Sequence, residues 1–222
     1  NLVGGTISGG SVNYADGAAL VYTATGGNLN NVTLGADIVL PSNTAVTLGG
    51  STRFATAHLT GPSSSLRLAP GYTLNDTVIA EGAGAGNRIL QLGYGNAGTN
   101  TFSPTAIVRL APGTGGGLNI SESSNSTLLN NGLISSEAAG RAITLSMNAL
   151  GNLSGTTFTG GTWVADNGGT INLGTGRNIV TNAATIRIED TASSISGLTG
   201  LATNNGTFTL AGGRDLSTSG TL

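Results

Sequence analysis

Apolar residues recur two positions apart along most of the chain. Between residues 32 and 48 three such pairs follow one another, namely Val32 with Leu34, Ile38 with Leu40, and Val46 with Leu48. Side chains two apart lie on the same face of a β-strand. Gly35-Ala36 and Pro41-Ser42-Asn43 separate the pairs and are typical of tight corners. This stretch therefore predicts three short strands, enough for one turn of a three-sided solenoid.

The same rhythm continues to the far end of the chain. Its further pairs are Leu66 with Leu68, Leu118 with Ile120, Leu133 with Ser135, Ile143 with Leu145, Trp163 with Ala165, Ile186 with Ile188, and Ile195 with Gly197. No long stretch has a helical period. Residues 136–142 are the best candidate for one helical turn, which Gly140 interrupts. Residues 81–88 and 93–104 combine glycine with no alternation and are expected to be loops that leave the solenoid near 81–104 and carry specificity.

Two phrases occur twice. NGGTINLGTGRNI at 167–179 returns as NNGTFTLAGGRDL at 204–216, and LRLAPG at 66–71 returns as VRLAPG at 108–113. Repetition at a fixed offset is the signature of a repeat architecture. If the distance between two copies spans two turns, one turn has about 20 residues. We therefore predict one all-β parallel solenoid over residues 1–222, with roughly eleven turns, no long helix, and Leu173 and Leu210 facing inward.

Three runs also resemble a known group of repeats. They are LNNVTLGADIVLPSNTAVTLGG (29–50), STLLNNGLISSEAAGRAITLS (126–146) and TGGTWVADNGGTINLG (159–174). In style they are similar to the right-handed parallel β-helix regions of large secreted bacterial surface proteins, such as filamentous haemagglutinins and autotransporter passenger domains. The resemblance implies an extracellular stalk, adhesin or filament component, and it brings no catalytic motif.

The composition limits the cross-links that the chain can form and the kinds of partner that it can bind. Charged residues make up 8% of the chain, the net charge is −2, and there is neither cysteine nor lysine. No disulfide can brace the fold, and no Lys–Asn isopeptide bond can form. The charge provides no footprint for nucleic acid or an anionic membrane, and no apolar run is long enough for membrane insertion. The chain opens with Asn1 without a leader-like segment, so we expect any secretion signal to have been removed or to lie outside this sequence.

Parallel β-helices also host polysaccharide lyases and hydrolases, which need converging carboxylates. With turns of the expected length, Asp166 could lie beside Glu189, and Asp190 beside Asp215. Arg187 and Glu189 share a strand face and are expected to form a surface ion pair. Because the other acids are scattered, we expect no catalytic, cofactor-binding or metal-binding residue, and no cofactor. A polysaccharide-active enzyme remains the alternative, with several acids and an arginine in one groove as its discriminating feature.

Other residues have a structural and a functional interpretation. The only histidine, His58, has no acidic neighbour in sequence and is expected at the surface or at a strand end. Trp163 could stack on a sugar but is expected to fill the core. GAGAGNR at 82–88 lacks the aspartate of calcium-binding repeats. Thr-x-Thr pairs at residues 23, 99, 157 and 207 are too irregular to favour an ice-binding face. A carbohydrate- or ice-binding surface stays a further alternative, which an ordered ladder of threonines or aromatics would support. Asparagine pairs at 30, 130 and 204 suit left-handed corners and amide stacking.

The two ends lack a sequence signature of a cap. Neither NLVGGTISGG nor RDLSTSGTL contains an amphipathic helix, a charged cluster or a proline. Solenoid ends expose strand edges that natural proteins blunt. We therefore expect the chain to pair head to tail with itself or to continue in a longer β-helix, with surface glycans as a further candidate partner. The leading hypothesis is a non-catalytic extracellular stalk or filament unit.

Overall fold

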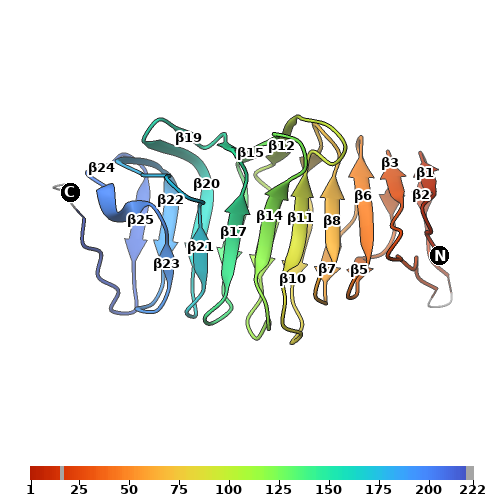
Figure 1. Cartoon of the computed structure of the whole chain (residues 1–222), viewed down its shortest axis with the longest axis horizontal. Helices are drawn as coiled ribbons and strands as arrows, with labels where there is room; N and C mark the ends of the chain where they lie inside the picture. Colours follow the sequence, from red (N-terminus) through yellow and green to blue (C-terminus); the bar gives the residue numbers. More distant parts are fainter. Residues whose placement is uncertain (16–17, 219–222) are drawn as a thin grey trace.

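A computed structural model of the chain describes residues 1–15 and 18–218. The chain winds into a parallel β-solenoid whose strands stand side by side along the long axis, with the termini at opposite ends (Figure 1). There are about eight turns of about 24 residues. At ~4.8 Å per turn, the solenoid is roughly 40 Å long. The all-β parallel solenoid is thus confirmed, and among the described residues the one helical element is the short 3-10 segment η1 (Leu198–Gly200).

Each turn crosses three walls. The first is a nine-stranded sheet of β1 (Thr6–Ser8), β3 (Asn28–Asn30), β6 (Ala45–Gly49), β8 (Ser65–Leu68), β11 (Arg88–Leu92), β14 (Leu118–Glu122), β17 (Ala142–Ser146), β21 (Thr170–Asn172) and β23 (Ser194–Ile195). The second wall is made of small sheets: β2 (Ser11–Val12) with β4 (Thr33–Leu34), and the four-stranded set β9 (Thr73–Leu74), β12 (Thr99–Phe102), β15 (Thr127–Asn130) and β18 (Ala149–Leu150).

The third wall is a ten-stranded sheet. Its main path is β5 (Ile38–Leu40), β7 (Thr56–Leu59), β10 (Thr77–Ala80), β13 (Ile107–Leu110), β16 (Leu133–Ser136), β20 (Thr157–Ala165), β22 (Thr181–Ile188) and β24 (Thr203–Asn204). β25 (Thr207–Leu210) also pairs with β22, and the short β19 (Leu153–Ser154) pairs antiparallel with β20. The other strand pairings of the described chain are parallel, so nearly all strand contacts join one turn to the next.

The expected turn length is too short, and the expected count of eleven turns is therefore too high. Turns also differ in length. Leu29 pairs with Leu48 across a short turn, whereas Leu90 pairs with Ile120 across a much longer one. Most of the difference lies in the corners: residues 93–98 lengthen the turn from Leu90 to Ile120, and residues 81–87 lengthen a corner of the turn before it. Corner residues carry no strand periodicity, which is why the pattern of strands could not count them.

The repeated phrases explain the same error. LRLAPG contains β8 of the nine-stranded sheet, whereas VRLAPG contains β13 of the ten-stranded sheet. What repeats is a strand followed by the same turn: Gly71 and Gly113 have φ of 76° and 75°, and each turn closes with a bond to the carbonyl of Ala69 or Ala111. Pro followed by a positive-φ Gly is the sequence of a type II turn. The two phrases therefore mark the same kind of corner on two different walls. The number of residues between them is not a whole number of turns, so halving it gave a wrong turn length.

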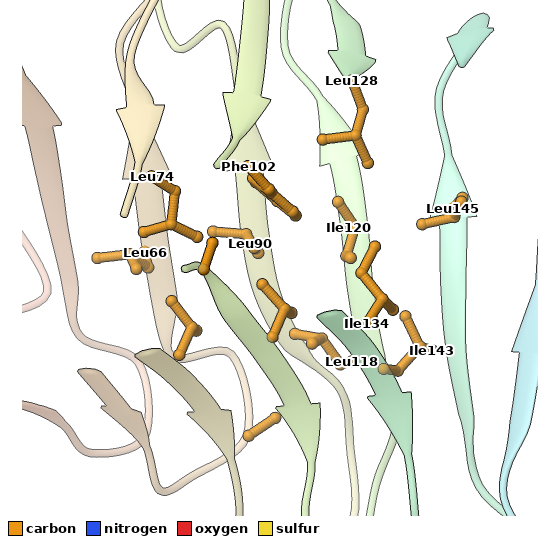
Figure 2. Packing of buried hydrophobic residues seen from close by; sticks show 14 of the residues in the cluster. Leu66, Leu74, Leu90, Phe102, Leu118, Ile120, Leu128, Ile134, Ile143 and Leu145 are labelled. Atoms are coloured by element: carbon orange, nitrogen blue, oxygen red, sulfur yellow. The ribbon is translucent and has the colours of Figure 1, made fainter. Parts of the chain in front are cut away.

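The core is a continuous apolar column along the axis. Figure 2 shows leucine, isoleucine and phenylalanine side chains pointing into the interior from strands of all three walls. Among the predicted strand pairs, Val46 with Leu48 and Ile186 with Ile188 are buried as expected. The pair Leu133 and Ser135 is assigned to the wrong face, because Ile134 occupies the inward column and pairs with Trp163 and Val108.

Leu173 is fully buried, as predicted, but Leu210 is 36% exposed. Leu210 pairs with the buried Ile188, so it has the expected inward register. It lies in the last strand of the described chain, and residues 219–222 of the expected uncapped end lie outside the described residues. The inward column is thus less protected at Leu210 than at Leu173.

Other local expectations are corrected. Residues 136–142 form the end of β16, a turn with Gly140 at φ 66°, and the start of β17, rather than a helical turn. The expected loop at 93–104 contains strand β12, in which Asn100 and Phe102 are buried. No helix among the described residues is long and apolar enough to cross a membrane.

The loop at 81–87 leaves the strands but is held by a buried cation. The Arg88 side chain is fully buried. Its guanidinium donates hydrogen bonds to the carbonyl oxygens of Glu81, Gly82, Gly84 and Gly86 at 2.7–3.0 Å. Burial lowers the pKa of Arg88. Because guanidinium has five N–H donors, it can bond to several loop carbonyls at once. The loop is thus anchored from inside the solenoid.

Candidate functional site

Three carboxylates stand in one column on the outer side of the ten-stranded sheet. Glu137, Asp166 and Glu189 each follow the last paired residue of β16, β20 and β22, and these last residues are themselves in register. The expected proximity of Asp166 and Glu189 is therefore confirmed at the level of register. Glu137 was missed, because the turn from Glu137 to Asp166 is longer than the turn from Asp166 to Glu189. Because the two turns differ in length, a constant turn length could not predict that the three acids share a column.

A shallow groove of about 580 Å³ runs over this column. Its lining residues are Leu133, Ser135, Glu137, Thr162, Val164, Asp166, Arg187 and Glu189. A second hollow is also lined by Glu137 and Asp166 and reaches Asp190. In the register of the sheet, Arg109 and Arg187 lie in the column beside the acids. The groove thus brings several acids together with arginines, which sequence reasoning named as the discriminating feature of an enzyme.

The charge of Glu137 is compensated by the preceding turn. Arg109 Nε donates to Glu137 Oε1 at 2.8 Å, and Arg109 Nη2 donates to Oε2, a two-point contact. Ser135 also donates to Glu137 Oε1 at 2.8 Å. The hydrogen bonds to Glu137 raise the pKa of Arg109. A carboxylate held in this way is a poor general base, because its oxygens already accept strong hydrogen bonds.

The other acids of the groove are also engaged. Glu189 forms the expected ion pair with Arg187 on its own strand. Asp166 accepts a hydrogen bond from the Asn167 amide at 2.7 Å, and no ion pair to it occurs within the described residues. Asp166 is therefore the carboxylate of this column that lacks a cationic partner. Acid–base hydrolysis of a glycosidic bond uses two carboxyl groups, and the other two acids of this column each have an arginine partner.

The predicted pairing of Asp190 with Asp215 is not found. Asp190 braces its own corner: it accepts bonds from the backbone amides of Gly168, Ala192 and Ser193 and from the Ser193 hydroxyl. These bonds, the Ser193 hydroxyl first, lower the pKa of Asp190. Gly212 lies level with Asp190 on the following turn, and no bond to Asp215 is present in the described chain.

His58 has partners that its sequence neighbourhood does not show. Its Nδ1 lies 2.8 Å from Glu81 Oε1, and its Nε2 lies 3.5 Å from Asp37 Oδ2. The two acids come from the turns on either side, since β7 pairs with both β5 and β10. The side chain is 26% exposed, which fits the expected surface position. No group of three acidic or histidine side chains in the described chain is arranged to hold a metal ion.

The aromatic and polar candidates take structural roles. Trp163 is fully buried, as expected; its Nε1 donates to the Gly160 carbonyl at 3.1 Å, and its ring lies 5.0 Å from that of Phe158. The expected left-handed corner is found at Asn31, with φ 56°, but not at the asparagine pairs at 130 and 204. Amide contact between turns is seen where the amide of Asn182 donates to Asn204 Oδ1 at 2.8 Å.

Threonines do form a short column on the outer face of the ten-stranded sheet. Thr162, Thr185 and Thr207 are in register on successive turns. Leu133 and Ile107 then replace them in the same column. The Thr-x-Thr pattern found only one member of this set, Thr207. A column interrupted so soon is too short to present a regular threonine face.

Searches against protein-family models, curated proteins and solved structures find no match. What the strand pairings establish is the fold, a parallel β-solenoid.

Proposed function

We propose that this chain is a non-catalytic structural segment of an extracellular bacterial surface protein, a stalk or filament unit built to hold its shape. The observation that supports this proposal is the use of the charged side chains. Most of the described ion pairs join one turn to the next, where they brace the stack, instead of leaving acids free in a groove.

Three contacts illustrate this use. Arg53 on one turn holds Asp76 on the next, with both Nε and Nη2 within 3.1 Å of the carboxylate. Arg109 holds Glu137 in the same two-point manner, and His58 lies between acids of both neighbouring turns. A two-point arginine–carboxylate contact fixes orientation as well as charge. Placed between turns, it resists sliding and twisting of one turn against another.

The core supports the same role. Buried aliphatic side chains occupy corresponding positions on successive turns, so each turn buries its neighbour's apolar face. Such a stack extends by adding turns, and its outer surface is set by the side chains that alternate outward. The proposed partner is the next solenoid unit along the axis, either a second copy of the chain or further turns of a longer one.

A direct test of the non-catalytic role is to incubate the purified protein with neutral and acidic polysaccharides. Polysaccharide chain length would be followed by light scattering after size-exclusion chromatography, with ultraviolet absorbance for the unsaturated products of a lyase. We expect no change in polysaccharide chain length over hours.

Electron microscopy of a dilute sample tests the assembly: rods longer than about 40 Å with a regular axial repeat support end-to-end stacking, whereas isolated short particles contradict self-assembly.

A polysaccharide-active enzyme is the second candidate, because Glu137, Asp166 and Glu189 stand in one column beside two arginines. The same polysaccharide assay separates the two functions. Cleavage that disappears in Asp166→Asn but persists in Asp37→Asn, a change of another outer carboxylate, would replace the structural proposal by the enzymatic one. Cleavage that persists in both variants would be a contaminant.

A further inference from the structure

The second wall has an opening near residue 150. The four-stranded sheet ends at β18, and the corresponding segment of the next turn, residues 174–178, contains no strand. Two adjoining hollows lie there, of about 480 and 280 Å³, and both are lined by Asn148 and Arg177. We call the larger one the polar slot. Its lining residues are Glu122, Thr144, Leu145, Ser146, Met147, Asn148, Asn172, Gly174, Thr175, Gly176 and Arg177.

A carboxylate in the slot occupies a position that leucine holds in the preceding turns. Glu122 pairs with the fully buried Leu92, and buried Leu48 and Leu68 precede Leu92 in the column. Oε1 of Glu122 accepts a bond from the Asn148 amide at 2.9 Å. Oε2 is shielded from solvent and has no hydrogen-bond partner among the described residues. A shielded carboxylate oxygen without a partner is costly, so this atom lowers the stability of the turn that carries it.

An arginine closes the other side of the slot. Arg177 Nη2 donates to the Met147 carbonyl at 2.5 Å, and Nη1 donates to the Leu173 carbonyl. Burial lowers the pKa of Arg177, which the nearby Glu122 partly offsets. No ion pair to Arg177 is present within the described chain. Guanidinium has five N–H donors, so donors remain after the two carbonyls are satisfied.

The rest of the lining is neutral and hydrogen-bonding. The hydroxyl groups of Thr144, Ser146 and Thr175 make no hydrogen bond within the described residues. The side chain of Asn172 accepts a bond from the Gly174 amide through Oδ1, which leaves its NH₂ group available. The slot therefore offers one negative group, one positive group and several neutral donors and acceptors.

We propose that the polar slot binds one unit of a neutral saccharide. A sugar hydroxyl donates and accepts at once, so adjacent hydroxyls can donate to Glu122 Oε1, whose bond from the Asn148 backbone amide is exposed, and accept from Arg177. A metal ion would face the charge of Arg177, and a free anion would face that of Glu122. A volume of about 480 Å³ accommodates one or two sugar rings. The slot lies apart from the ion pairs that support the structural role, so the two proposals stand or fall separately.

The test is saturation-transfer NMR and amide chemical-shift mapping of the intact chain with a panel of neutral hexoses and disaccharides. We expect binding at millimolar concentrations, with shifts confined to residues of the slot such as Asn148 and Arg177. Glu122→Gln keeps the shape of the side chain but loses the charged acceptor, and we expect about a tenfold loss of affinity. Glu122→Leu should abolish binding while raising the thermal midpoint, which separates loss of the site from loss of the fold.

Glu81→Gln is the matched control, because it removes a glutamate carboxylate outside both the slot and the groove and should leave saccharide affinity unchanged. Three results would overturn the proposal: no saccharide bound even at about 10 mM, equal loss of affinity in Glu81→Gln and Glu122→Gln, or shifts of the slot residues with glycine or glutamate but with no sugar. The last result would identify a zwitterionic ligand instead.

Discussion

Two glutamates on neighbouring walls show how one residue type takes opposite roles. Glu137 lies on the outer side of the ten-stranded sheet, and Arg109 of the preceding turn holds both of its oxygens. Glu122 is the last residue of β14 in the nine-stranded sheet, follows leucines in its column and lines the polar slot, and one of its oxygens has no partner in the described chain. The register places a cation beside the first and an opening beside the second. The side chains of the adjacent turns therefore decide whether a charged residue in this solenoid forms an ion pair between turns or lines a candidate binding site.

The largest loss of stability should follow from placing a charge in the apolar core, where no side chain of opposite charge and no solvent can reach it. Leu173 is fully buried, and Leu173→Asp should destabilise the chain by about 4 kcal/mol or more, because an isolated carboxylate is then buried among apolar side chains. Circular dichroism during thermal and urea unfolding measures this loss. Leu210→Asp, at the 36% exposed end of the column, is the matched change and should cost about 1 kcal/mol. Equal losses would contradict the difference in burial.

A smaller loss should follow from removing a buried cation that has carbonyl partners. Arg88→Met keeps much of the buried volume but leaves the four loop carbonyls without their donor, so we expect a loss of about 3 kcal/mol. Hydrogen exchange should rise in residues 82–87 before the rest of the chain. Arg109→Met removes an exterior brace and should cost about 1 kcal/mol or less, because surface ion pairs are weak. If both variants lose the same stability, the contrast between inner and outer arginines fails.

Glu122→Leu should instead gain stability, because it restores the leucine of the column and removes an oxygen without a partner. We expect a gain of about 1–2 kcal/mol, or a rise of a few degrees in the thermal midpoint. The same change at Glu137 should give no gain, since it would strand Arg109. A lower midpoint for Glu122→Leu would mean that the carboxylate is already satisfied within the fold.

The smallest effect concerns pH and the corner acid Asp190. Its pKa is lowered in the folded chain, so its contribution to stability is present above the ordinary aspartate pKa of about 3.9 and is lost as the pH falls through the lower folded value. Asp190→Asn should therefore lose less stability than the unmodified chain between about pH 4 and pH 2. Thermal midpoints measured across that range check the sign, and an identical slope for both chains would contradict it.

The strand faces could be predicted because a strand has a fixed period of two. Val46 and Leu48, or Ile186 and Ile188, are recognised by that period alone and are buried as expected. The approach failed at Leu133 and Ser135, where one apolar residue faces outward beside a buried serine. It also failed for the length of a turn, because corners such as residues 81–87 have no period.

The candidate sites were less predictable than the strands. Asp166 and Glu189 were expected to be neighbours from an approximate turn length, and the register agrees. Glu137 joins them only because the turn before is longer than expected, and His58 gains Asp37 and Glu81 only through the turns on either side. Each of these contacts depends on the exact register between turns, which a single added corner residue would shift.

By itself, the sequence determined the all-β architecture, the alternation of inner and outer positions, and the buried state of residues such as Trp163 and Leu173. These features follow from local periodicity and from the need to bury apolar side chains. Tertiary structure alone decided which charges meet. Most ion pairs form between turns, so the partners of a charge depend on the lengths of the corners, which no periodic pattern encodes. These lengths place Arg109 beside Glu137 and leave one oxygen of Glu122 without a partner among the described residues.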